Sequence, residues 1–510
     1  SHRIATERDL ENLDIEHLRI GLGPAELSAH GSVQGLSGIP RLALEVDEQK
    51  LNLGDLAAYL RGAGLLEEGI GLVGELLVHA ALKGPWDPAS RVSQYPQLSG
   101  KVALRDGTVE TPDLLVPIEG LTADLELDNK TLKLSTLAFK AGRSDLSLAG
   151  QVGGMLDGLL APVHGPNARP AYRVELASDL LDLDEMLPVV VTAPAATASS
   201  GSDLRWGFVS VAHAASAAAA PDETSPLLWF VRTMNGKGVL NIGKMVSDGV
   251  PFTGLRSDLR TDQGIMHLEN LAADVLGGKM TGQVKLDARS ESGPSPVEAA
   301  ISVDNVMADG LLAELLKLSL PIQGRMGLSI AMSGAVDSTL ELVQKAIRAE
   351  GRARVSEGKI VNWPLLQQVA SSVGQLGFMN FDEIPIRSLL ALFRVADERV
   401  YLNRLSVKAA DMDWRLGGSS GLDGSLDLTV DVDVPASRLN IAGMQLGQTL
   451  QGLLGGEEAS IPLRIRVGGT VDAPQVKAQL QPGGGETSGK KGGTQENLKE
   501  KGKGLLRKLF

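Results

Sequence analysis

Hydrophobic and polar residues alternate along most of this 510-residue chain. Residues 424–434 read Gly-Ser-Leu-Asp-Leu-Thr-Val-Asp-Val-Asp-Val, with Leu or Val at every second position and polar residues between them. Successive side chains of an extended strand point to opposite faces, so this segment predicts a strand with one apolar and one polar face. The same alternation recurs at residues 42–46, 121–127, 132–134, 172–176, 284–286, 326–332 and 461–467.

The recurring pattern predicts a mainly β protein with a long antiparallel sheet. Few segments show the helical period that would be needed to cover the apolar face of this sheet. The sheet must therefore close into a sandwich, a barrel or a groove. About 20 strands at ~4.8 Å each would extend roughly 100 Å, which is too long for one closed barrel.

A composite unit recurs four times and indicates a repeat array. Each copy has a strand end that contains glycine, a turn and an alternating strand. It then has a four-residue segment with leucine and aspartate, which we call the acidic-leucine step and which begins a short helix. The copies start at Gly31, Gly150, Gly282 and Gly417. The first three steps, at residues 53–56, 181–184 and 308–311, predict short helices.

Turns and further helices follow from local signals. Ser338 and Glu341 form a capping box that predicts a helix to about Ala349, and apolar spacing predicts helices at 365–376 and 444–454. Hairpin turns are predicted at Asp106-Gly107, Asp128-Asn129, Asp262-Gln263-Gly264, Glu357-Gly358, Asp397-Glu398 and Asp423-Gly424.

Composition divides the chain into five parts. We expect groove repeats at 1–191, an Ala/Ser/Pro-rich linker or disordered insertion at 192–226 and a second β-region at 227–480. A Gly/Ser/Lys linker at 481–494 and a basic amphipathic tail at 495–510 follow. Strand-like pattern begins by about Ile15, without a signal peptide or a membrane-spanning apolar run, so we expect a fragment whose anchor lies upstream.

Charge and residue usage exclude several classes of site. The net charge is −13 and no basic stripe is interleaved with aromatic residues, so nucleic acid is not an expected partner. The chain has no cysteine, and its seven histidines show no metal-ligand spacing. Aromatic residues are only 3%, so the apolar face consists of aliphatic side chains. We expect neither a metal nor a cofactor.

Three short motifs resemble catalytic or cofactor sites, and each has a structural interpretation that we favour. The glycine pattern at 69–74 lacks the preceding strand and following helix that dinucleotide binding requires. The Gly-x-Ser-x-Gly at 417–421 is expected in a turn between two strands rather than in a nucleophile elbow. The Ser-x-x-Lys at 356–359 is expected at a turn–strand junction without companion motifs. We therefore do not expect an enzyme.

A series of short segments in residues 236–478 has a characteristic order and spacing. These segments are 274–282 (Asp-Val-Leu-Gly-Gly-Lys-Met-Thr-Gly), 285–289, 305–306, 311–316, 324–325, 332–334, 349–353, 358–360, 461–465 and 468–474 (Gly-Gly-Thr-Val-Asp-Ala-Pro). With them, residues 236–478 resemble the C-terminal region of the AsmA family, which comprises large envelope proteins of Gram-negative bacteria. Residues 74–152 resemble, more weakly, the strand repeat shared by AsmA and TamB-like proteins.

The resemblance implies an elongated, curved β-groove of repeated strands whose concave apolar face carries phospholipid or another acyl-chain lipid between the inner and outer membranes. It also implies a periplasmic location, with an inner-membrane anchor outside this chain. A membrane surface is an expected partner, through that anchor and through the basic tail. The alternation then supplies the expected groove-lining residues: Leu125, Leu127, Leu134, Val174, Leu286, Leu328, Ile330, Met332, Leu426, Leu428, Val430, Val432, Leu463 and Ile465.

Two other function classes stay open at this point. A structural or adhesive β-repeat protein would pack its apolar faces against each other and bind no lipid. An envelope hydrolase would rest on the Gly-x-Ser-x-Gly motif alone.

Overall fold

The computed structural model describes residues 11–480, except 65, 68, 87–95, 113, 129, 155–168, 187–224, 291–292, 313–321, 339, 341, 362–382, 410–411, 422, 436–459 and 471–472. Its described strands form one sheet of 22 strands. They are β1 Asn12–Leu22, β2 Ala25–Gln34, β3 Arg41–Asn52, β4 Gly71–Pro85, β5 Gln97–Glu110, β6 Ile118–Asp128, β7 Thr131–Ala141, β8 Ser144–Gly153, β9 Ala171–Asp182, β10 Asn235–Ser247, β11 Val250–Asp262, β12 Ile265–Val275, β13 Gly278–Asp287, β14 Ser295–Met307, β15 Ile322–Val336, β16 Arg348–Val361, β17 Glu383–Ala396, β18 Arg399–Ala409, β19 Met412–Gly421, β20 Leu426–Pro435, β21 Ser460–Gly469 and β22 Pro474–Leu480.

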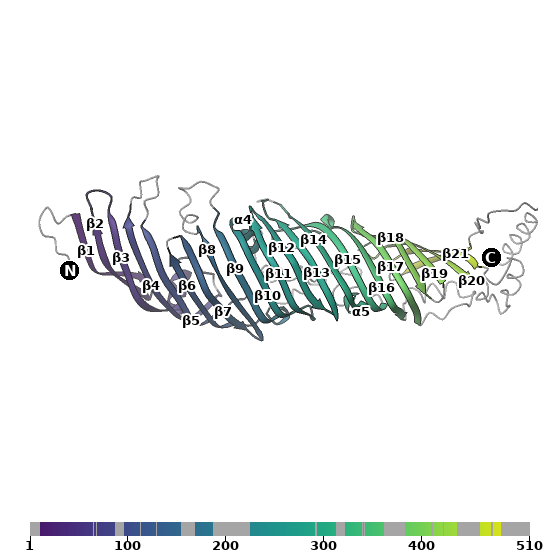
Figure 1. The fold of residues 1–510 in the computed structure, drawn as a ribbon, viewed down its shortest axis with the longest axis horizontal. Coiled ribbons are helices and arrows are strands. Elements are labelled where there is room, and N and C mark those ends of the chain that lie inside the picture. Colours follow the sequence, from purple (N-terminus) through teal and green to yellow (C-terminus); the bar gives the residue numbers. More distant parts are fainter. Residues whose placement is uncertain are drawn as a thin grey trace, which may run out of the picture.

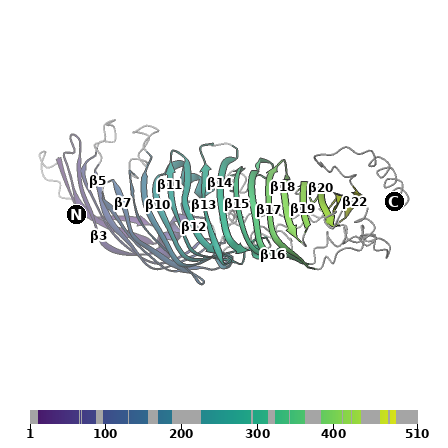
Figure 2. The same cartoon turned by 45° about the vertical axis from the view of Figure 1, so that its right-hand side comes forward.

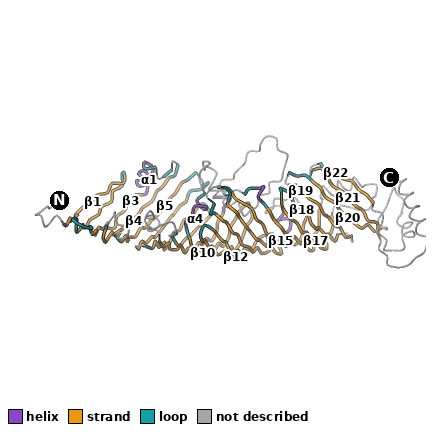
Figure 3. The backbone as a smooth tube through the Cα atoms, turned by 90° about the horizontal axis from the view of Figure 1, so that it is seen from above, coloured by secondary structure: helices purple, strands orange, loops and turns teal. Residues whose placement is uncertain are grey.

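Each strand pairs with the next strand in sequence, so the sheet is a meander that grows in one direction (Figure 1). All of these pairs are antiparallel except β9–β10, which are parallel in the register Val174↔Gly238. The sheet is elongated, curved and open, with no second sheet facing it among the described residues (Figures 2 and 3). The predicted fold class is confirmed.

Three of the six predicted turns, at Asp262-Gln263-Gly264, Asp397-Glu398 and Asp423-Gly424, lie between strands, but two do not. The sixth, Asp128-Asn129, follows β6, and Asn129 lies outside the described residues. Asp106-Gly107 and Glu357-Gly358 lie inside β5 and β16, where the register with a neighbouring strand shifts by a β-bulge. Asp106 and Glu357 have φ values of 49° and 52°. A left-handed residue followed by glycine suits a bulge as well as a turn, so the dipeptide alone does not distinguish the two.

The short helices lie at the two ends of the strands. The helices α1 (Leu53–Gly62), α3 (Leu183–Met186) and α5 (Ala308–Gly310) follow β3, β9 and β14 at what we call the lower rim. They begin at the acidic-leucine steps of the predicted repeat. The helix α4 (Pro226–Thr233) precedes β10 at the opposite, upper rim (Figure 1).

The predicted helix at 338–349 is wrong. A 3-10 turn, η4 (Gln344–Ala346), and the start of β16 occupy this segment. The bridge between Val336 and Leu342 and the pairing of Ser333 with Arg348 hold the chain in extended form. Sheet pairing therefore overrides the local capping signal. The predicted helices at 365–376 and 444–454 lie outside the described residues.

The sheet continues without interruption across the predicted boundary at residue 227, because β9 pairs directly with β10. At the lower rim, α3 joins the two sides of this parallel pair. The Asp184 carboxylate accepts the N–H groups of Asp248 and Gly249 at 2.7 Å each, and Glu185 accepts Arg143 Nε at 3.1 Å. The predicted linkers at 192–226 and 481–494 and the tail at 495–510 lie outside the described residues, except for Ser225 and Pro226.

Candidate functional site

The strand register places the predicted lining residues on one face of the sheet. Directly paired residues of neighbouring strands point to the same face, so a face can be followed from strand to strand. One row, apolar except for Ser420, crosses sixteen strands, a distance of roughly 70 Å at ~4.8 Å per strand. It consists of Val102, Leu125, Leu134, Gly150, Val174, Gly238, Leu259, Leu268, Val284, Ala299, Met332, Ala349, Val395, Val400, Ser420 and Leu426.

Two parallel rows carry further predicted residues on this face. The first joins Met280, Val303, Leu328, Ala353, Ala391, Leu405, Leu416, Val430 and Ile465. The second joins Ile301, Ile330, Gly351, Phe393, Leu402, Gly418, Leu428 and Val467. The remaining predicted residues, Leu127, Leu286, Val432 and Leu463, lie two positions from members of these rows on their own strands.

The neighbouring row, one residue along the strands, is polar across the twelve strands from β5 to β16. It contains Lys101, Glu126, Lys133, Gln151, Arg173, Lys237, Arg260, His267, Lys285, Glu298, Ser333 and Arg348. Neighbouring strands exchange ion pairs on this polar face, for example Lys285 with Glu298 at 3.3 Å and Arg464 with Asp431 at 2.6 Å. The hydrogen bond from the Arg464 guanidinium lowers the pKa of the Asp431 carboxyl.

The predicted lining residues differ in how far the protein itself covers them. Leu125, Leu127, Leu134, Val174, Met332, Leu426, Leu428 and Val430 are half-buried. Leu286, Leu328, Ile330, Val432, Leu463 and Ile465 are buried, with between 2% and 7% of their surface exposed. The half-buried group therefore offers apolar surface to a ligand, whereas the buried group is already covered by protein.

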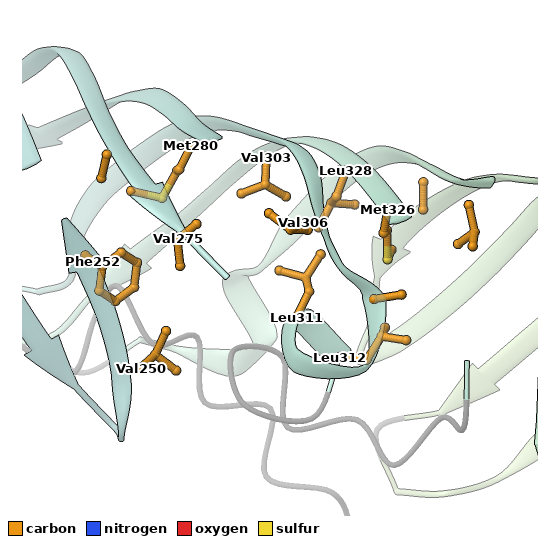
Figure 4. Close-up of a cluster of buried hydrophobic side chains, with 14 of the residues drawn as sticks. Val250, Phe252, Val275, Met280, Val303, Val306, Leu311, Leu312, Met326 and Leu328 are labelled. Carbon is orange, nitrogen blue, oxygen red and sulfur yellow. The ribbon is translucent and has the colours of Figure 1, made fainter. Parts of the chain in front are cut away.

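One cluster of buried side chains includes the segment that follows α5. Leu311 and Leu312 follow this helix and are 1% and 4% exposed. They lie in one cluster with Val306, Met326 and Leu328 of the sheet, and Figure 4 shows the side chains of Leu311 and Val306 pointing toward each other. The chain segment after β14 therefore folds back onto the apolar face and covers it locally.

The residues that pair with Val174 on the two adjacent strands are both glycines, Gly150 and Gly238, so no side chain lies beside it in the row. A Cβ atom on Gly150 would lie 2.9 Å from Val174 Cγ1, and one on Gly238 would lie 2.9 Å from Val174 Cγ2. Side chains at either position would collide with Val174. The two glycines thus keep the row continuous at the parallel pair without adding bulk over it.

The motifs that resemble catalytic sites have structural roles. Ser419 lies inside β19, not in the predicted turn, and its hydroxyl accepts Arg399 Nη2 at 3.0 Å. The Ser356–Lys359 motif lies inside β16 at a bulge rather than at a turn–strand junction. The glycine pattern at 69–74 comes after α1 and runs into β4, which begins at Gly71, so the order of helix and strand is the reverse of that for dinucleotide binding. Within the described ranges, no group of three His, Asp or Glu side chains is placed to hold a metal ion.

Sequence reasoning missed part of the apolar face in β4 and β5. Val78 pairs with Val102, and Leu76 pairs with Leu104, so these strands extend the same face toward the N-terminal end. The signal was the alternation of Leu98, Gly100, Val102 and Leu104, which glycine makes less visible. Exposed apolar residues at the rims, such as Trp86, lie outside the alternating strands, so hydrophobic periodicity does not reveal them.

The described helices include none that is long and apolar enough to cross a bilayer. Neither the curated proteins nor the solved structures provide a match to this chain. The family model described as AsmA family matches residues 92–351, slightly more than half of the chain. This range overlaps the predicted AsmA-like region and extends it toward the N-terminus. The family is associated with envelope assembly and lipid transport and is not known as a family of enzymes. The chain belongs to the AsmA family.

Proposed function

We propose that this protein is a bridge-like lipid carrier of the Gram-negative envelope, in which phospholipid acyl chains move along the apolar face of the sheet. The lipid passes between the inner and outer membranes and supports outer-membrane biogenesis. The protein acts in the periplasm, held at the inner membrane by a segment outside this chain. Its partners are the lipid and the membrane surfaces, and no catalytic step is involved.

The observation that carries the proposal is the continuous row over sixteen strands, apolar except for Ser420, with a polar row beside it over the twelve strands from β5 to β16. A soluble protein rarely leaves an apolar surface of this length in contact with water. Leu125, Leu134 and Val174 in this row are only half-buried. An acyl chain that lies along them removes the exposed apolar surface from water, and successive strands offer it nearly equivalent positions.

Site-specific photo-crosslinking in cells tests this proposal. Leu125 pairs with Leu134 on the apolar face, and the adjacent residues Glu126 and Lys133 pair with each other on the polar face. These four positions lie on the same two strands and differ mainly in the face they occupy. We expect crosslinkers at Leu125 and Leu134 to capture phospholipid and those at Glu126 and Lys133 not to. Equal capture from both faces, or none from either, would remove the proposal.

Native mass spectrometry of the protein extracted from membranes supplies a second measurement. Bound phospholipid at one or more molecules per chain supports the carrier. A structural or adhesive β-repeat protein would yield lipid-free protein. A single open sheet among the described residues favours the carrier, because a sandwich requires a second apolar layer against the first.

A further inference from the structure

Three exposed apolar side chains gather at the upper rim near the N-terminal end of the sheet. Leu36 and Ile39 lie in the connection between β2 and β3, and Trp86 directly follows β4. Their exposed fractions are 48%, 49% and 46%. We call these three residues the rim patch.

A backbone hydrogen bond joins the β2–β3 connection to the end of β4. The Trp86 N–H donates to the Pro40 carbonyl at 2.8 Å, which joins the end of β4 to the β2–β3 connection. Within that connection, Gly38 N–H donates to the Gly35 carbonyl at 3.0 Å. The β2–β3 connection, which carries Leu36 and Ile39, is therefore held against the start of the segment that carries Trp86.

The rim patch adjoins the half-buried part of the apolar face. Arg41 pairs with Pro85 at the rim, and Leu42 and Leu44 then pair with Gly84 and Leu82. Leu82 in turn pairs with Leu98 of β5. An apolar path thus leads from the exposed rim onto the face without an intervening charged row on that side of the sheet.

We propose that the rim patch inserts into a phospholipid bilayer surface and places the entrance of the apolar face there. This inference rests on the proposed lipid function and adds the site at which lipid is exchanged. Tryptophan beside aliphatic side chains is the combination that favours the interfacial layer of a membrane. The exposed Arg41, at the base of the patch, supplies a positive charge for anionic headgroups. The nearby negative charge of Glu11 is engaged by the Ser37 hydroxyl, which donates to its carboxylate at 3.3 Å.

The test is vesicle flotation of the full chain with phosphatidylcholine vesicles, with and without phosphatidylglycerol. We expect the triple variant Leu36→Ser, Ile39→Ser, Trp86→Ser to bind at least about tenfold more weakly, because each truncation removes apolar surface that the membrane would bury. The control is Leu115→Ser, which changes an exposed leucine (59%) at the lower rim and should bind like the wild type. Equal binding by the triple variant, or no vesicle binding by the wild type, overturns the proposal.

Two further measurements separate this inference from the lipid function. Brominated lipids should quench tryptophan fluorescence in the wild type, and Trp86→Phe should bind normally but lose most of the quenching. A crosslinker at Leu125 should capture phospholipid supplied in detergent micelles equally in the wild type and the triple variant, whereas capture from vesicles should fall in the variant. If the wild type captures no lipid from either source but still needs the patch to bind vesicles, the carrier function fails and the docking site stands.

Discussion

The strands β1 to β8 and the strands β10 to β18 carry the same apolar–polar alternation, but their apolar faces are covered to different extents. In β1 to β8, the buried hydrophobic strand residues are alanines together with Leu42 and Leu51. In β10 to β18, large side chains such as Met280, Val303 and Leu328 are buried in one continuous cluster. We refer to these two regions as the open region and the covered region.

The difference follows from what lies at the rims. In the covered region, Leu311 and Leu312 after α5 lie against the sheet, and Leu228 and Val231 of α4 cover Met266 and Leu286. In the open region, α1 buries only Ala57 among its own residues. An alternating strand is thus a potential lipid surface, and short rim elements decide whether that surface is available.

The largest expected effect comes from placing a charge in the two regions. Leu328→Asp puts a carboxylate at a position that is 7% exposed and should lower the free energy of unfolding by about 4 kcal/mol or more. Leu125→Asp, at a half-buried position, should cost about 1–2 kcal/mol, because water reaches the charge. Urea unfolding measures both changes. Equal destabilisation of the two variants would show that the regions do not differ in the way described.

Removing the cover should convert part of the covered region into open surface. Leu311→Ala is expected to cost about 2–4 kcal/mol, since Leu311 is 1% exposed and its loss leaves a cavity. In the same variant, a crosslinker at Leu328 should capture more lipid than it does in the otherwise wild-type protein. Leu115→Ala, at an exposed site, provides the control and should change stability by less than about 0.5 kcal/mol. If the amount of lipid captured at Leu328 does not change, the strands of the sheet alone, and not Leu311, bury Leu328.

The parallel pair between the regions gives a smaller effect. Asp184→Ala removes the acceptor of two backbone N–H groups, those of Asp248 and Gly249, and should cost about 1–2 kcal/mol. Hydrogen exchange should rise at the β10–β11 turn before it rises in β8. The exposed Asp179 of β9 offers a matched aspartate, and Asp179→Ala should leave exchange at this turn unchanged. Protection that is equal in the two variants would mean that α3 does not hold the turn.

The smallest effect concerns pH and the polar face. Arg464 lowers the pKa of Asp431 in the folded protein, so the pair stabilises the fold above the unfolded carboxyl pKa of about 3.9. This contribution is lost as the pH falls through the lower folded value. Both side chains are 37% exposed, so the expected loss is below about 1 kcal/mol. Thermal melts of the wild type and Asp431→Asn at pH 7 and pH 3 should differ more at pH 7 than at pH 3.

The alternation determined the strands, their two faces and the membership of all fourteen predicted lining residues in the apolar face, because the side-chain period of a strand is fixed by its backbone geometry. The acidic-leucine steps also located α1, α3 and α5 correctly. Local sequence signals gave wrong predictions where pairing with another strand, rather than contact with neighbours in sequence, determines the backbone conformation. Glu357-Gly358 forms a bulge rather than a turn, and residues 348–349 join β16 rather than a helix.

Only the tertiary structure decided that β9 and β10 are parallel and that the sheet stays open. It also decided that Leu328 is buried whereas Leu125 is only half-buried. It also brought the connection that carries Leu36 and Ile39 to Trp86, through the hydrogen bond from Trp86 N–H to the Pro40 carbonyl. Periodicity assigns a side chain to a face, but it contains no information about what lies across that face. Coverage depends on contacts between segments distant in sequence, such as Leu311 with the strands around Leu328, and these form only when the chain folds.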